Sequence, residues 1–554
     1  MLDVPLLIGG QSRPAGDGRT FERRNPVTGA VVSRVAAATL DDADAAVAAA
    51  QAAFPAWAAL APNERRSRLL RAAEQLQARS EEFIAAAGDG RTFERRNPVT
   101  GAVVSRVAAA TLDDADAAVA AAQAAFPAWA ALAPNERRSR LLRAAEQLQA
   151  RSEEFIAAAG ETGAMANWYG FNVRLAANML REAASMTTQI TGEVIPSDVP
   201  GSFAMALRQP CGVVLGIAPW NAPVILATRA IAMPLACGNS VVLKASELSP
   251  AVHRLIGQVL QDAGLGDGVV NVISNAPADA AAIVERLIAN PAVRRVNFTG
   301  STHVGRIVGE LAARHLKPAL LELGGKAPLL VLDDADLDAA VAAAAFGAYF
   351  NQGQICMSTE RLIVDAKVAD AFVAKLAAKV ESLRAGDPAA ADSVLGSLVD
   401  ASAGTRIKAL IDDALEQGAQ RVVGGQLDGS ILQPTLLDGV TESMRLYREE
   451  SFGPVAVVLR GNGDEELLRL ANDSEFGLSA AIFSRDTGRA LALAQRVESG
   501  ICHINGPTVH DEAQMPFGGV KSSGYGSFGA KASIEHFTQL RWVTLQNGPR
   551  HYPI

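Results

Sequence analysis

The middle of the chain alternates short apolar runs with longer segments of helical character. Residues 211–223 predict a buried strand that ends in a proline-rich turn, 224–237 a helix and 239–247 a second strand. Further helices separate apolar runs at 269–273 and 293–298. Strands of continuous apolar residues alternating with helices are typical of a parallel, doubly wound α/β sheet.

A second α/β pattern follows in the C-terminal half. A strand is expected at 362–364, a helix at 366–383 and a buried apolar run at 478–483. The segment 190–209 has short strand-like pieces between turns and is expected to be extended and partly exposed. The predicted fold class is therefore α/β, with one doubly wound parallel sheet and a second α/β domain.

A tandem repeat dominates the first third of the chain. Residues 15–88 recur at 87–160 without a single difference, so that the segment 15–86 is copied at 87–158 with an offset of 72. Repeat architectures diverge and need several copies, so one perfect copy indicates a very recent duplication or an error in the assembled sequence. Without it the chain would have 554 − 72 = 482 residues. The fold must either mix the copies or dock one and leave the other as an appendage.

Composition narrows the class of protein. The chain has 554 residues, 49% of them hydrophobic, enough for large cores and more than one domain. Its net charge of −8 argues against a nucleic-acid partner. The most apolar run, 213–243, is broken by prolines and an arginine, and the N-terminus lacks the basic region of a signal peptide, so neither a membrane span nor export is expected.

Cysteine usage points to a reducing compartment. The four cysteines are widely spaced and form no C-x-x-C pair, which favours neither a disulfide framework nor a metal site. We therefore expect a cytoplasmic protein without a bound metal. The cysteines are Cys211, Cys237, Cys356 and Cys502.

Cys356 is the candidate nucleophile. It follows an alanine-rich helical run and lies in Q-I-C-M-S-T, among small and polar residues two or three positions away, where a helix gives way to a loop. A lone cysteine is more often an inert, buried small residue. Glu322 changes that balance: it lies 356 − 322 = 34 residues upstream, in L-L-E-L-G-G-K. A thiolate can attack a carbonyl, and a carboxylate can later activate water to release the acyl group. The two glycines would let backbone approach a ligand.

A glycine turn offers a phosphate site. The strand that ends at 298 continues into T-G-S-T-H-V-G-R, which opens a helix at Ser301 with free backbone N–H groups. This is not the G-x-G-x-x-G fingerprint, and alone it is equally consistent with an ordinary strand-to-helix turn. Lys244 and Glu247 strengthen the case, because they end a neighbouring strand and can meet ribose and phosphate oxygens. Glu247 would also repel a 2′-phosphate, which favours NAD over NADP.

Four motifs in this order, P-W-N, E-L-G-G-K, G-Q-I-C and E-x-F-G-P, resemble the signature of the aldehyde dehydrogenase superfamily. The resemblance implies that Cys356 forms a hemithioacetal, that hydride passes to NAD, and that Glu322 acts as base to hydrolyse the thioester. The Asn221 amide and the Cys356 backbone N–H would stabilise the oxyanion, and the thiol would need a depressed pKa. The implied cofactor-binding residues are Trp220, Lys244, Glu247, Gly300, Ser301, Gly305, Glu450 and Phe452.

The same resemblance implies a domain plan and an assembly. An NAD-binding domain would comprise 1–190 and 211–323, and a catalytic domain 324–530. The segments 191–210 and 531–554 would form a small β oligomerisation arm, in which 535–546 resembles the strand that joins a partner subunit. A homodimer or homotetramer is therefore expected.

The residues around the motifs look most like the branch of salicylaldehyde and vanillin dehydrogenases of aromatic catabolism. The expected substrate is a small aromatic aldehyde with a ring hydroxyl, salicylaldehyde above all. Arg229 lies 229 − 221 = 8 residues after Asn221, about two helical turns, and could pair with a phenolic oxygen while Trp168 stacks on the ring; a solvent-facing arginine is equally consistent. His510 is expected to be a loop residue rather than a ligand. The expected substrate residues are Trp168, Tyr169, Ala222, Arg229, Ile355 and Met357.

Other functions remain open at this point. The substrate could instead be vanillin, benzaldehyde or an aliphatic aldehyde or semialdehyde, whereas Glu322 as hydrolytic base disfavours a CoA-acylating reaction. A protein of another class is also possible, since a fold does not guarantee activity and the duplication could leave an inactive binding protein.

Overall fold

The computed structural model describes residues 2–24, 31–61, 63–68, 71, 91–552 and 554. The junction of the repeat at 86/87 lies outside these residues. By its contacts the chain divides into two compact units, 1–93 with 106–109, and 94–105 with 110–554.

Among its described residues, the smaller unit contains a three-stranded sheet of order β1-β5-β4, a two-stranded hairpin β2-β3 and a helix of 19 residues. Its strands are β1 (Leu2–Val4), β2 (Leu6–Ile8), β3 (Gln11–Arg13), β4 (Thr20–Arg24) and β5 (Val31–Ala36), and its helix is α1 (Leu40–Ala58). Strands β6 (Thr92–Arg96) and β7 (Val103–Ala108) of the second copy pair with each other.

The helix of the repeat forms twice. In α1, Thr39 caps the N-terminus through a capping box with Asp42. Thr111 and Asp114 make the same box at the start of α4 (Leu112–Ala130), which has the identical 19-residue sequence. Local sequence alone therefore specifies this helix in both places.

The two copies of the helix differ in how deeply they are buried. Trp129 on α4 is 1% exposed, whereas Trp57, the same residue on α1, is 41% exposed. Helix α4 contacts α10 and strands β11 and β12 of the larger unit. Of the two arrangements expected from the repeat, the structure adopts the one in which copy two is docked.

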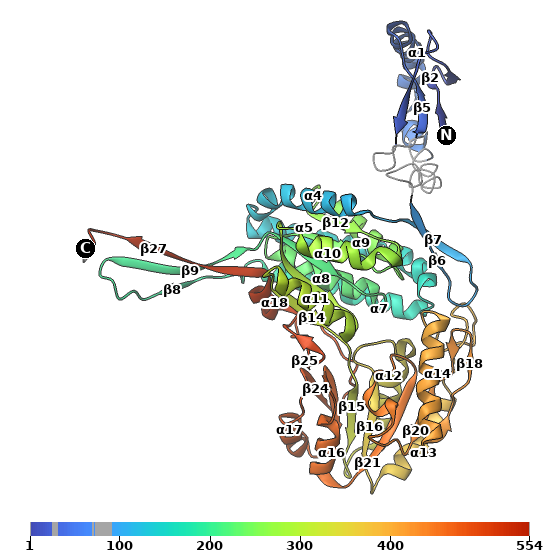
Figure 1. The fold of residues 1–554 in the computed structure, drawn as a ribbon, viewed down its shortest axis with the longest axis vertical. Helices are drawn as coiled ribbons and strands as arrows, with labels where there is room; N and C mark the ends of the chain where they lie inside the picture. The colour runs from blue at the N-terminus through green and yellow to red at the C-terminus, as the bar shows by residue number, and fades with distance from the viewer. Residues whose placement is uncertain (1, 25–30, 62, 69–70, 72–90, 553) are drawn as a thin grey trace. The chain divides into compact units, whose positions relative to one another are not determined.

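The larger unit is built around a six-stranded sheet of order β12-β11-β10-β13-β14-β26 (Figure 1). All its neighbours pair in parallel except β14 and β26. The strand order reverses between β10 and β13, which is the switch point where doubly wound sheets bind ligands. The predicted doubly wound sheet is confirmed. Its strands are β10 (Val213–Ile217), β11 (Ser240–Lys244), β12 (Val270–Ile273), β13 (Val293–Thr299), β14 (Ala319–Glu322) and β26 (Gly524–Tyr525).

Helices cover both faces of this sheet. Alternate residues of β10 separate the two cores: Val213 and Leu215 join a cluster with α4, α10 and α11, and Val214 joins one with α5, α7, α8 and α9. The helices are α5 (Pro134–Ala150), α6 (Ser152–Ala157), α7 (Ala166–Met186), α8 (Pro223–Ala236), α9 (Pro250–Asp262), α10 (Ala280–Ala289) and α11 (Thr302–Arg314). Among the described residues, no helix combines the length and apolar character needed to cross a membrane.

A seven-stranded sheet of order β17-β20-β21-β16-β15-β23-β24 forms the second α/β layer, parallel except for β17 with β20. The chain enters it directly from β14, through the four residues 323–326 that follow Glu322. Its strands are β15 (Ala327–Val331), β16 (Thr359–Asp365), β17 (Gln420–Val423), β20 (Thr435–Asp438), β21 (Val455–Gly461), β23 (Ser479–Phe483) and β24 (Ile501–Ile504). Its helices are α12 (Leu337–Tyr349), α13 (Ala369–Glu381), α14 (Ala401–Glu416), α15 (Arg445–Arg448), α16 (Gly463–Asn472) and α17 (Thr487–Ala494).

The expected arm is an antiparallel three-stranded sheet of order β27-β9-β8, drawn as a long ribbon in Figure 1. Strand β27 (Thr538–Gln546) pairs along its full length with β9 (Ser202–Pro210), and β8 (Glu193–Ile195) lies on the other side of β9. Helix α18 (Ala530–Phe537) leads into β27, and the short pairs β18 (Leu427–Asp428) with β19 (Ile431–Leu432) and β22 (Phe476–Gly477) with β25 (Val520–Lys521) complete the strands.

Candidate functional site

Two cavities meet at Cys356. One of about 300 Å³ has mostly apolar and aromatic walls, and the other, of about 370 Å³, lies beside the switch point of the six-stranded sheet. Three residues line both cavities: Asn221, Leu226 and Cys356. The thiol therefore lies where a molecule in either cavity can meet it.

The backbone before Cys356 is strained. Within the short 3₁₀ segment Phe350–Gly353 that follows α12, Asn351 and Gln352 have φ of 48° and 56°, in the left-handed region that non-glycine residues rarely adopt. Both side chains hold the turn: Asn351 Nδ2 donates to the Asn221 carbonyl (3.1 Å), and Gln352 Nε2 donates to the Ser397 carbonyl (3.0 Å). This turn fixes the position of the cysteine at the end of the helix, as the sequence predicts.

Glu322 ends strand β14 as a buried carboxyl group. Among the residues that the structure describes, none donates a hydrogen bond to either carboxylate oxygen. Burial raises the pKa of Glu322 to about 8, while the Arg229 cation acts in the opposite direction. A carboxyl group of this pKa can take or give a proton near neutral pH.

The expectation of a depressed thiol pKa is wrong for this state of the protein. Burial raises the pKa of Cys356 well above its ordinary value, and the carboxylates of Glu322 and Glu450 raise it further. Arg229 lowers it, but not enough to reverse the balance. A sequence motif indicates the thiol but not the sign of the field around it, because that field comes from residues far apart in the chain.

Asn221 follows β10 at the switch point and lies beside the nucleophile loop. Its Nδ2 donates to the Gln354 carbonyl (3.0 Å), and its backbone carbonyl accepts from Trp168 Nε1 (2.9 Å). The side-chain amide is thereby held next to Cys356, at the wall shared by both cavities.

Both glycines of E-L-G-G-K lie tightly against other parts of the protein, and Gly324 also lines the second cavity. A Cβ on Gly325 would collide with the Cys356 carbonyl oxygen, and one on Gly324 would lie 2.6 Å from a Glu450 carboxylate oxygen. The Gly325 N–H donates to the other oxygen of Glu450 (2.8 Å). Glycine is needed here because the link between the two sheets passes directly against the nucleophile loop.

The second cavity collects most of the predicted cofactor residues. Phe452, with φ of 47°, places its ring edge-on to Trp220, with centroids 5.8 Å apart. The turn at Gly300 and Ser301 opens α11, where Ser301 is the N-cap residue. The predicted residues that line this cavity are Trp220, Gly300, Ser301, Glu450 and Phe452.

Three predicted cofactor residues do not line it. Lys244 and Glu247 form an ion pair with each other, and Asn275 Nδ2 also donates to Glu247 (2.9 Å). A Cβ on Gly305 would collide with Leu323, so this glycine allows α11 to pack closely on the link that follows β14.

The first cavity contains five of the six predicted substrate residues: Trp168, Ala222, Arg229, Ile355 and Met357. The structure does not bring Tyr169 to it. Tyr169 is fully buried, and its hydroxyl lies 3.1 Å from that of Thr162.

Sequence reasoning missed the aromatic walls and the polar end of this cavity. Helical spacing could have indicated some of them: Phe171 follows Trp168 by three residues, Ile225 follows Ala222 by three, and Phe350 follows Phe346 by four. No local signal indicates the residues from the C-terminal loop. The missed residues are Phe171, Ile225, Leu226, Phe346, Phe350, Pro507, Val509, His510, Asp511 and Phe517.

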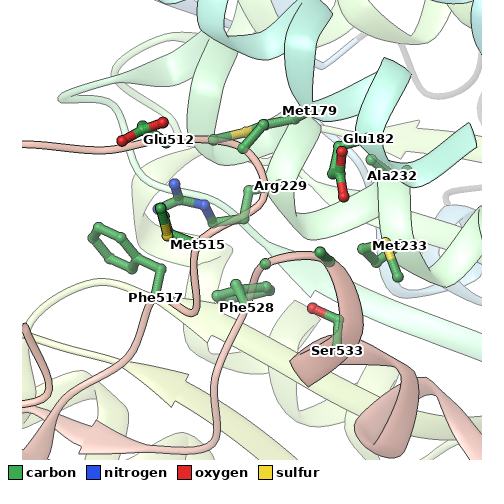
Figure 2. Close-up of a pocket in the computed structure, with 14 residues that line it drawn as sticks. Met179, Glu182, Arg229, Ala232, Met233, Glu512, Met515, Phe517, Phe528 and Ser533 are labelled. Carbon is green, nitrogen blue, oxygen red and sulfur yellow. The ribbon is translucent and has the colours of Figure 1, made fainter. Parts of the chain in front are cut away.

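Arg229 points into the protein, which decides between the two interpretations left open. It is 7% exposed, forms an ion pair with Asp511, and lies over the Phe517 ring at 4.1 Å from the centroid. Figure 2 shows its guanidinium between Met515, Phe517 and the loop of Glu512. Its charge is therefore already balanced by Asp511.

The comparisons with known proteins agree with this geometry. The aldehyde dehydrogenase family model matches residues 13–88 and 85–543. The chain belongs to the aldehyde dehydrogenase family. The two matched segments overlap at residues 85–88 because of the repeat, and each copy matches the family model.

Several aldehyde dehydrogenases are similar over most of their length. The chain is 93% identical to a vanillin dehydrogenase of Pseudomonas fluorescens and 51% identical to a salicylaldehyde dehydrogenase of Pseudomonas putida, in each case over 84% of this chain and 97% of the relative. The crystal structure of a salicylaldehyde dehydrogenase from Pseudomonas putida G7 complexed with salicylaldehyde has a TM-score of 0.83 at 50% identity, covering 84% of this chain and 97% of that one.

A buried ion pair joins three motifs of this aldehyde dehydrogenase. Lys326 and Glu360 lie 2.5 Å apart, with side chains only 1% and 3% exposed. Glu360 also accepts from the backbone N–H groups of Ser451 (2.8 Å) and Phe452 (3.2 Å). Sequence reasoning did not single out this pair, although it ties E-L-G-G-K to the nucleophile strand and to the loop of Phe452.

We expect Glu360→Gln to lower the free energy of unfolding by about 3–5 kcal/mol, because it leaves the Lys326 charge buried without a counter-charge. Urea unfolding of the purified protein measures this. Glu449→Gln is the matched control: its pair with Arg445 is about half exposed, so a loss of at most about 1 kcal/mol is expected. Equal losses for the two variants would contradict a structural role of the buried pair.

Proposed function

We propose that this aldehyde dehydrogenase oxidises an aromatic aldehyde to its carboxylic acid with NAD as cofactor. The single observation that carries the proposal is the position of Cys356 at the wall shared by two cavities. One cavity suits an apolar ring, and the other suits a dinucleotide at the switch point of a parallel sheet. A catalytically inactive binding protein would not need this convergence.

In this proposal each residue has one chemical task. The Cys356 thiolate attacks the aldehyde carbon, and the oxyanion is stabilised by Asn221 Nδ2 and the Cys356 backbone N–H. Glu322 takes a proton from the water that hydrolyses the resulting thioester. Bound NAD supplies the hydride acceptor, held by the residues of the second cavity.

The raised pKa of Cys356 makes ionisation of the thiol a step of its own. Burial and two neighbouring carboxylates favour the neutral thiol. Glu322 is kept in this proposal for the later step, the hydrolysis of the thioester, and its pKa of about 8 suits a base that works near neutral pH.

An aromatic aldehyde is favoured by the walls of the first cavity. Trp168 contacts both Phe171 (5.6 Å between centroids) and Phe350 (5.1 Å), which gives a planar ring aromatic partners. The 93% identity to a vanillin dehydrogenase, against 51% to salicylaldehyde dehydrogenases, leads us to propose vanillin as the preferred substrate ahead of salicylaldehyde.

NAD rather than NADP is proposed because of Glu247. This carboxylate follows strand β11 and is paired with Lys244, so a 2′-phosphate near it would meet a negative charge. Both cofactors occur among similar structures: one is described in complex with nicotinamide adenine dinucleotide (35% identical), another as an NADP dependent enzyme (34%).

We further propose that residues 1–190 and 211–323 form the NAD-binding domain, 324–530 the catalytic domain, and 191–210 with 531–554 an oligomerisation arm. The arm exposes Trp542 (79%), Val194 (67%) and Leu540 (61%), a concentration of large apolar side chains that favours a homodimer or homotetramer. All four cysteines are free, which agrees with a reducing compartment such as the cytoplasm.

Two substitutions test the chemistry. Cys356→Ala should abolish NADH formation from vanillin, whereas Cys502→Ala, at a cysteine that lines neither cavity, should retain it.

Glu322→Gln should slow steady-state turnover by about 10²- to 10⁴-fold, since the base is lost. In the unchanged protein, turnover should rise with pH through about 8, because Glu322 must be ionised to act.

The decisive readout is covalent. Glu322→Gln incubated with NAD and vanillin should accumulate an acyl group on Cys356, visible by mass spectrometry of the intact protein. Absence of both NADH formation and the adduct, with folded protein, would rule out the proposed reaction. Benzaldehyde and hexanal, compared with vanillin by kcat/KM, separate an aromatic from an aliphatic preference.

Assembly through the arm is tested by Trp542→Arg. A charge in the middle of the exposed apolar strand should reduce the mass measured by light scattering from that of a dimer or tetramer toward that of a monomer. Leu491→Arg, at an exposed apolar residue on α17, is the control and should leave the mass unchanged. Equal masses for both variants would argue against the arm as the interface.

A further inference from the structure

Asp511 is the acidic residue at the polar end of the aldehyde cavity. Its side chain is 10% exposed, and one carboxylate oxygen, Oδ2, is paired with Arg229. The other oxygen, Oδ1, is buried and meets no hydrogen-bond donor in the part of the chain that the structure describes. A cavity with apolar walls therefore contains one ionisable acceptor with an unused oxygen.

We propose that Asp511 Oδ1 accepts a hydrogen bond from a ring hydroxyl of the aromatic aldehyde. The inference rests on the proposed function and names the group that recognises the substituent. A buried acceptor without a partner is costly, and a substrate that brings a donor removes that cost. An analogue that cannot donate leaves the oxygen unpaired, so the site discriminates against it.

Arg229 acts as the positioning residue for this acceptor. Its guanidinium is fixed over the Phe517 ring, and it fixes Asp511 through Oδ2. This assigns Arg229 a different task from the direct contact with a phenolic oxygen that the sequence suggests.

Other polar groups of the cavity have other partners or tasks. Asn221 and Cys356 face the reacting carbonyl in the proposed function. His510 is about half exposed, and its Nε2 lies 2.9 Å from Glu512 Oε1. Asp511 is thus the buried acceptor best suited to a hydroxyl on the ring.

The test compares ring hydroxyls with methoxy groups of similar size that cannot donate. For the unchanged protein, kcat/KM should favour the hydroxybenzaldehyde over the methoxybenzaldehyde by about 10- to 100-fold at one ring position. Asp511→Asn keeps the shape but presents an amide, and this ratio should fall toward one. Glu512→Gln makes the same charge change at the next residue, which does not line the cavity, and should leave the ratio as it was.

A hydroxyl-to-methoxy ratio near one at all ring positions in the unchanged protein would overturn the inference without any variant, even if Asp511→Asn does not fold. So would a ratio that Asp511→Asn and Glu512→Gln alter equally. Failure of the proposed function has a different signature: neither vanillin nor benzaldehyde would be oxidised. Oxidation of benzaldehyde without a hydroxyl preference would overturn only the role of Asp511.

A second inference comes independently from the repeated helix. Helix α4 is anchored by Trp129, whose Nε1 donates to the Leu235 carbonyl (3.1 Å), and by buried Val119. The equivalent Trp57 and Val47 on α1 are 41% and 65% exposed. Helix α1 therefore has every side chain that the docking site of α4 recognises.

We infer that α1 can replace α4 when docking of α4 is lost. The chain would leave the larger unit after α1, at the turn 59–61, and rejoin it at the equivalent turn 131–133 before α5, 72 residues later. Closure entropy grows only slowly with loop length, so a loop of this size does not forbid the exchange. The same segment would then fill the site from a different place in the chain.

Arginine substitutions test the exchange, because a charge cannot replace the buried indole. Trp57→Arg should leave the oxidation of vanillin unchanged, and Trp129→Arg should retain at least half of it because α1 takes over. The double variant should lose soluble, active protein. Deleting 15–86 or 87–158 gives the same 482-residue chain (554 − 72), which has a single copy of the helix. In that chain, arginine at the one remaining copy of this tryptophan should cause as large a loss of soluble, active protein as the double variant does in the full chain.

Loss of activity by Trp129→Arg equal to that of the double variant would overturn the inference. Rescue confined to larger oligomers would also overturn it, since the helix would then come from a second chain. Size-exclusion chromatography with an activity assay on each fraction distinguishes these results from exchange within one chain.

Discussion

The site depends on a very close approach between two segments of backbone. The link from the six-stranded to the seven-stranded sheet passes so near the nucleophile loop that residue 325 has no room for a Cβ beside the Cys356 carbonyl oxygen. Because Glu322 ends the strand just before this link, the same approach brings a buried carboxyl group to the thiol. Lys326, the last residue of this link, forms an ion pair with Glu360, which lies four residues after Cys356. Catalytic geometry and the joining of the two sheets are thus one feature.

Burial at this junction determines the protonation of the two reactive groups. It disfavours the charged forms of both Cys356 and Glu322, so each has a raised pKa. Arg229 is the nearby cation, yet it is shared with Asp511, whose charge acts on Glu322 and Cys356 in the opposite sense. The resting protein therefore holds a thiol and a carboxyl group that are both poised to be neutral, and its reactivity depends on moving protons between buried groups.

Much of the fold and of the site can be predicted from sequence, for reasons that are local. Apolar runs indicate strands β10 to β13, and the capping box at Thr39 marks the start of its helix to the residue. Motifs indicate Cys356, Glu322 and Asn221, which the structure brings together. What sequence cannot supply is the sum of distant contributions: the sign of the thiol pKa, the partner of Arg229 some 511 − 229 = 282 residues away, and the burial of Tyr169 beside its cavity-lining neighbour Trp168.

The same substitution should have different effects in the two copies of the repeated helix. A substitution at Val119 would open a cavity in a packed core, whereas the same substitution at Val47 would alter only a solvent-exposed face. Mutations should therefore accumulate first in the earlier copy, beginning with its apolar residues. The two segments are identical at every position, so packing alone, and not sequence, distinguishes the two helices.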